Sequence, residues 1–219
     1  MKQAFEIIQV KPSIFLFKFK DYYDMAMHFL RYQEYYESSS PKFRGKQFEI
    51  FDFMRWYSKK YGKDSFTYPK DWGGYNIPSS VISEVYPNIT DYNRYDNAMY
   101  QAYIQCNLQL GQVTKTPKFY IIGAVGNGET LKHEVAHGFF YTVPKYKEEM
   151  IKLTKELSPP LVKSLKTTLT KMGYTPKVHV DEIQAYMATG LADEFDSKLD
   201  KLCVPFIKVF KKYFNLTSS

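Results

Sequence analysis

The chain has 219 residues, of which 44% are hydrophobic and 18% aromatic, so it is long enough to bury a sizeable core. A formal net charge of +7 favours acidic partners such as nucleic acid, but the lysines are spread along the chain and no nucleic-acid-binding motif surrounds them, so this indication is weak. Because no run approaches a transmembrane span and the N-terminus lacks a signal-peptide pattern, we expect a soluble protein of the cytoplasm or another reducing intracellular compartment, without membrane association.

The first part of the chain, residues 1–117, predicts two strands and then helices. Alternating runs at residues 5–10 and 14–19 flank a turn, which is typical of paired strands. Helical spacing follows at residues 21–37, where Asp21 can cap the helix, and again at 46–61 and 91–110. Residues 64–78 contain two prolines and two glycines and predict a long irregular loop.

The second part, residues 118–219, begins with an apolar, β-branched run at 118–125 that predicts a strand. Helices are expected at residues 129–141, 146–157 and 161–172, followed by an extended piece at 177–180 and a helix that Asp181 opens. The tail, 194–214, predicts an amphipathic helix that is kinked or broken near Pro205. No linker or repeat is visible, so we expect one domain over residues 1–219, of the α+β class, mostly helical with a small mixed β-sheet.

Two cysteines lie far apart in the sequence and outside any C-x-x-C spacing. Cys106 and Cys203 therefore indicate neither a disulfide framework nor a cysteine zinc site. We expect both to be buried thiols, because free cysteine usually packs as a small hydrophobic residue.

The segment TLKHEVAHGF, residues 130–139, contains the pattern H-E-x-x-H on a predicted helix. Four residues make about one helical turn, so the imidazoles of His133 and His137 leave the same face and can bind one zinc ion at about 2.0–2.1 Å. Glu134 then projects beside the metal without binding it. There it can take a proton from a metal-bound water and later pass it to a leaving amine, which is the role of a general base.

The same segment resembles the longer consensus of the zincin metallopeptidases. That consensus asks for Thr or Val at its start, uncharged residues around the two histidines and a hydrophobic residue after them, and six positions comply: Thr130, Leu131, Val135, Ala136, Gly138 and Phe139. The metzincin branch requires a Gly and a third His where this chain has Phe140 and Val143, so that branch is excluded.

Further along, DEIQAY resembles the second motif of the gluzincins, in which a glutamate is followed three residues later by alanine. The resemblance implies that Glu182 is the third zinc ligand. His179 is the alternative third ligand. Thermolysin-like gluzincins carry an aspartate where this chain has Tyr186, which leaves Asp181 or Asp193 to orient a metal-binding histidine.

A peptidase also needs a donor near the oxyanion that forms during hydrolysis. Tyr141, His179 and Tyr186 are the candidates, and the sequence does not rank them.

The resemblance implies a zincin-like fold with an active-site helix, in which the strand at residues 118–125 is an edge strand to which a peptide or protein substrate adds. The expected function is zinc-dependent peptide hydrolysis, with Zn²⁺ as the cofactor. The alternative is a catalytically silent zinc-binding module that recognises a protein or nucleic acid. Residues 1–117 resemble no family, and the sequence predicts neither the oligomeric state nor the cleavage specificity.

Overall fold

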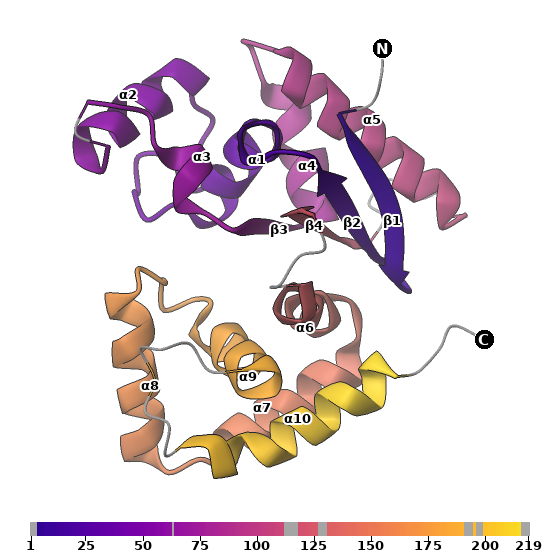
Figure 1. The fold of residues 1–219 in the computed structure, drawn as a ribbon, viewed down its shortest axis with the longest axis vertical. Coiled ribbons are helices and arrows are strands. Elements are labelled where there is room, and N and C mark those ends of the chain that lie inside the picture. Colours follow the sequence, from indigo (N-terminus) through magenta and orange to yellow (C-terminus); the bar gives the residue numbers. More distant parts are fainter. Residues whose placement is uncertain are drawn as a thin grey trace. The chain divides into compact units, whose positions relative to one another are not determined.

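The computed structural model describes residues 4–62, 64–111, 118–126, 131–190, 195 and 199–215. Its contacts cluster in two compact units, Met1–Thr130 and Leu131–Ser219, and each unit is described by itself. Over the described residues the chain is α+β, mostly helical with a small mixed sheet, as the sequence predicts (Figure 1). The single domain over residues 1–219 stays a prediction. None of the described helices combines the length and the apolar character that crossing a bilayer requires.

The first unit contains the four-stranded sheet, in the order β1-β2-β4-β3. Its strands are β1 (Phe5–Lys11), β2 (Ile14–Phe19), β3 (Gly74–Pro78) and β4 (Tyr120–Val125). The predicted hairpin of β1 and β2 is confirmed, with Ser13 taking a positive φ of 57° in the turn. Strand β4 pairs in parallel with β2 and antiparallel with β3.

The prediction that the strand at residues 118–125 is an edge strand is therefore wrong. With β2 on one side and β3 on the other, β4 has no open edge to which a peptide could add. Its partners come from distant parts of the chain, and β3 falls in the segment predicted as an irregular loop. That segment also contains a short helix, α3 (Tyr68–Asp71). Its prolines and glycines flank an alternation of only Tyr75 and Ile77, which is too short to predict a strand by itself.

Helix α1 (Tyr22–Glu37) packs against β3 and β4 and against the neighbouring helices of the unit (Figure 1). Those are α3, α4 (Ser79–Val85) and α5 (Arg94–Gln109). Asp21 caps α1 as predicted, since its Oδ1 accepts a hydrogen bond from the backbone N–H of Asp24 at 2.9 Å. Helix α2 (Ile50–Lys60) begins four residues later than predicted, and a short 3₁₀ turn (Tyr86–Asn88) follows α4.

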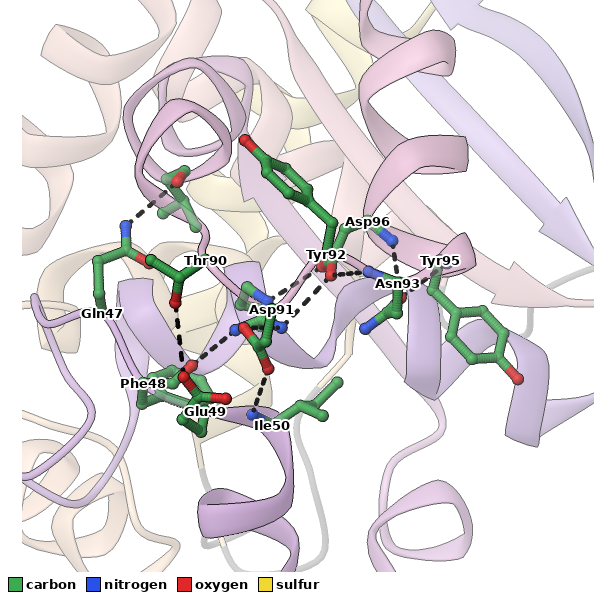
Figure 2. A network of polar contacts seen from close by, with 12 residues as sticks. Gln47, Phe48, Glu49, Ile50, Thr90, Asp91, Tyr92, Asn93, Tyr95 and Asp96 are labelled. Atoms are coloured by element: carbon green, nitrogen blue, oxygen red, sulfur yellow. Dashed lines mark hydrogen bonds and ion pairs between the residues drawn. The ribbon is translucent and has the colours of Figure 1, made fainter.

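Polar contacts join residues 47–50, around the start of α2, to residues 90–96, around the start of α5 (Figure 2), and Arg31 of α1 belongs to the same network. Arg31 forms ion pairs with Asp91 at 3.0 Å and Asp96 at 3.1 Å and donates to the carbonyl of Phe48 at 2.6 Å. Asp91 in turn accepts from the backbone N–H of Ile50 at 3.3 Å. Because Arg31 is only 2% exposed, these partners compensate for the cost of burying its charge.

The second unit is entirely helical in its described part. It consists of α6 (Leu131–Thr142), α7 (Pro144–Glu156), α8 (Pro159–Lys171), α9 (His179–Thr189) and α10 (Asp200–Phe214). Helix α9 contacts each of the other four. The extended piece predicted at 177–180 is wrong, because α9 begins at His179 and the N–H of Glu182 donates to the carbonyl of Val178. Val178 and Val180 favour extended backbone, and packing among the helices overrides that preference.

Helix α10 continues through Pro205, and residues 194 and 196–198 of the predicted tail helix lie outside the described residues. Both cysteines are free and buried, which confirms the prediction for them. Burial raises the pKa of Cys106 to about 12, so this thiol stays protonated near neutral pH.

Candidate metal centre

Three side chains of the second unit converge on one point: His133 and His137 from α6 and Glu182 from α9. The Nε2 atoms of the two histidines lie 3.1 Å apart, and Glu182 Oε2 lies 3.8 Å and 3.7 Å from them. These separations are short enough for all three atoms to contact one metal ion, and zinc binds histidine nitrogen and carboxylate oxygen at about 2.0–2.2 Å. The three atoms therefore form a group that could hold a metal ion.

Glu182 Oε2 supplies independent support for a cation at this point. The carboxylate is 6% exposed, and its Oε2 atom is buried without any hydrogen-bond partner. An unpaired carboxylate oxygen in such a place costs free energy unless a cation or a donor satisfies it. The donor set of two imidazole nitrogens and one carboxylate oxygen matches the protein ligands of catalytic zinc sites, which leave the fourth position open.

Hydrogen bonds to the other ring nitrogens favour the tautomer that a metal requires. His137 Nδ1 lies 2.9 Å from Asp181 Oδ1, and a carboxylate only accepts. His133 Nδ1 lies 3.3 Å from Thr189 Oγ1, whose hydroxyl already donates to the carbonyl of Ala185 at 2.7 Å. Each Nδ1 therefore carries a proton, which leaves each Nε2 as the ring atom that faces the shared point and could bind a metal there.

The electrostatic field at this point is negative. Burial lowers the pKa of His137, but the charges of Asp181 and Glu182 outweigh burial and hold this pKa well above its ordinary value. Glu134 contributes in the same direction and is 9% exposed. Two neutral histidines with Nε2 atoms 3.1 Å apart would repel each other through their lone pairs, and either a proton or a metal cation between them removes that repulsion.

The hydrogen bonds around Asp181 extend into the core of the second unit. Gln184, which is fully buried, donates to Asp181 Oδ1 at 2.9 Å and accepts from the hydroxyl of Tyr146 at 2.8 Å. Tyr146 belongs to α7, so three helices fix the orientation of the His137 ring. Asp181 thus takes the position that the sequence left open between Asp181 and Asp193, and Asp193 lies outside the described residues.

The candidate oxyanion donors differ in their surroundings. The Tyr186 ring packs on His133 with centroids 4.5 Å apart, and its hydroxyl lies 3.1 Å from that of Tyr174. His179, the alternative third ligand, instead places Nε2 at 3.2 Å from the carbonyl of Tyr174 and does not join the metal group. Tyr141 lies in the last turn of α6, four residues after His137.

Sequence reasoning missed Tyr174, Thr189, Gln184 and Tyr146 at this site. Burial and the neighbouring charge of Glu182 raise the pKa of Tyr174, so its hydroxyl stays protonated and can donate a hydrogen bond. For Thr189 a signal existed, since it follows Glu182 by seven residues and so shares its helix face.

Comparison of the chain with protein-family models, with curated proteins and with solved structures found no match.

Proposed function

We propose that the second unit is a zinc-dependent metallopeptidase of the gluzincin type, with His133, His137 and Glu182 as the zinc ligands. This proposal is supported by the convergence of two oriented histidines on a buried carboxylate oxygen that has no hydrogen-bond partner, with the charge of Glu134 nearby. The motifs H-E-x-x-H and E-x-x-A favour hydrolysis as the reaction, because together they combine the proposed zinc ligands with a general base.

A zinc ion bound there would polarise the scissile carbonyl and lower the pKa of a coordinated water to about 7. Glu134 accepts the proton of the attacking water and delivers it to the nitrogen of the leaving amine. Asp181 holds His137 through Nδ1, and Thr189 does the same for His133, so neither ring has to rotate as the reaction proceeds. The Tyr186 ring packs on His133, so its hydroxyl and that of Tyr174, which lies 3.1 Å from it, are the candidate donors for the developing oxyanion.

The alternative is a zinc-binding module without catalysis, and Glu134→Gln separates the two. This substitution keeps the shape of the side chain and removes the base, so peptidase activity on a mixture of unstructured peptides should fall by about 10²–10⁴-fold while the zinc content stays at the wild-type level. Glu148→Gln is the matched control, because Glu148 is exposed on α7. Zinc bound with no turnover in the wild-type protein would favour the silent module.

A further inference from the structure

An open groove of about 610 Å³ runs between the end of α7, α8 and the start of α9. Four apolar residues line it and come from all three places, and we call them its apolar floor: Leu157, Pro159, Val162 and Val180. Such a floor can bury an apolar side chain of a ligand, which is the usual driving force for binding in a protein groove.

Three of the residues that line the groove are lysines. Lys155, Lys163 and Lys166 line the groove and are all exposed, and none of the residues that line it is acidic. Between residues 154 and 180, which span the lining residues, Glu156 is the one acidic residue, and it does not line the groove. The lysine charges in the groove therefore have no acidic counterpart among its lining residues, and they complement a negatively charged ligand.

The threonines in the groove do not add hydrogen-bond donors. Thr154, Thr167 and Thr170 each donate the hydroxyl proton to the backbone carbonyl four residues earlier, at 2.8–2.9 Å. None of the lining residues is aromatic, although the chain contains 20 tyrosines and 17 phenylalanines. Single-stranded nucleic acid binds through bases stacked on aromatic rings, so this groove fits a peptide with carboxylates and an apolar side chain better.

The groove and the metal centre share the first turn of α9. Val180 lines the groove, and the next residue, Asp181, holds the ring of His137 at 2.9 Å. Thr170, which also lines the groove, lies 3.5 Å from Nε2 of His179 at the start of the same helix. A polypeptide bound in the groove is therefore held next to the turn that carries Asp181 and Glu182.

We propose that this lysine-rimmed groove is a binding site for an acidic polypeptide segment that carries an apolar side chain. Lys155, Lys163 and Lys166 contact its carboxylates, and the floor around Val162 and Val180 takes the apolar side chain. That the segment belongs to a substrate, which the groove captures for the metal centre, rests on the proposed function.

The test measures binding and needs no turnover. The probe is a short fluorescein-labelled peptide in which Asp and Glu alternate with Leu, titrated with the full-length protein and followed by anisotropy. The double variant Lys163→Glu/Lys166→Glu should weaken binding at least about 10-fold, because it reverses two of the three groove charges. Lys208→Glu/Lys211→Glu on α10 makes the same charge change at the same helical spacing and should bind as the wild type does.

Three results would each overturn the proposed peptide site: no peptide binding to the wild type, an equal loss of affinity in both double variants, or equal affinity when Ser replaces every Leu of the peptide. Stronger competition by a single-stranded RNA of equal charge would overturn it in favour of nucleic acid. Peptide binding without peptidase activity would contradict the proposed function alone. Zinc binding and peptidase activity without binding of the acidic peptide would contradict the proposed peptide site alone.

Discussion

At the scale of single residues, the candidate metal centre depends on the side chains that hydrogen-bond to Nδ1 of its two histidines. A histidine binds a metal through Nε2 only when Nδ1 holds the ring proton, and Asp181 and Thr189 impose that arrangement on His137 and His133. The two supports differ, because Asp181 adds a negative charge and Thr189 adds only a neutral acceptor. We therefore expect Asp181 to contribute more to metal affinity.

The substitution Asp181→Asn tests this support. Asparagine keeps the size and one acceptor oxygen and removes the charge, so zinc should bind about 10-fold or more weakly. The dissociation constant is measured by competition with a fluorescent chelator, with Asp200→Asn on α10 as the control. Unchanged affinity in Asp181→Asn would show that the carboxylate does not act on the metal site.

The sequence predicts the three residues that converge in the candidate metal centre but not the residues that hydrogen-bond to the two histidines, for a physical reason. His133, Glu134 and His137 lie within one helical turn, so their spacing alone places them together. Glu182 followed only from the resemblance to the gluzincins. The contacts of Asp181 and Thr189 with the two histidines span 44 and 56 residues, and no local periodicity encodes pairings of that kind.

At the scale of elements, the sheet shows that a local sequence pattern can predict a strand without predicting its neighbours in the sheet. The apolar run of β4 predicts a strand correctly, but its place in the sheet depends on β2 and β3, which lie far away in sequence. Gly123 in β4 lies directly against the Phe29 ring of α1. A Cβ added there would overlap the ring, so α1 approaches the sheet more closely than a side chain at this position would allow.

We expect Gly123→Ala to destabilise the protein by about 1–3 kcal/mol, because the methyl group forces the buried Phe29 ring or α1 to move. Guanidinium unfolding followed by circular dichroism measures the loss. Gly73→Ala is the control, since an added Cβ there meets nothing within 4 Å. A free energy of unfolding equal to that of the control, within about 0.5 kcal/mol, would contradict the close packing of α1 on β4.

At the scale of the whole molecule, the described groups that carry the proposed chemistry all belong to the second unit, Leu131–Ser219. The sheet, the aromatic core and the Arg31 network belong to the first unit. The sequence predicts most of the helices in both units, since each shows its own periodicity, but it shows no boundary between the units. Helix α6 follows β4 without a proline- or glycine-rich linker longer than a few residues.

If His133, His137 and Glu182 form one zinc site, zinc binds to purified full-length protein through all three side chains. Wild-type protein and Glu182→Gln are stripped of metal, titrated with zinc against a fluorescent chelator and compared with the control Glu148→Gln. We expect one zinc per chain in the wild type and the control, and affinity lower by more than about 100-fold in Glu182→Gln, because losing a metal ligand costs more affinity than losing a residue that orients one. Absence of zinc binding in the wild type, or equal affinity in Glu182→Gln, would contradict it.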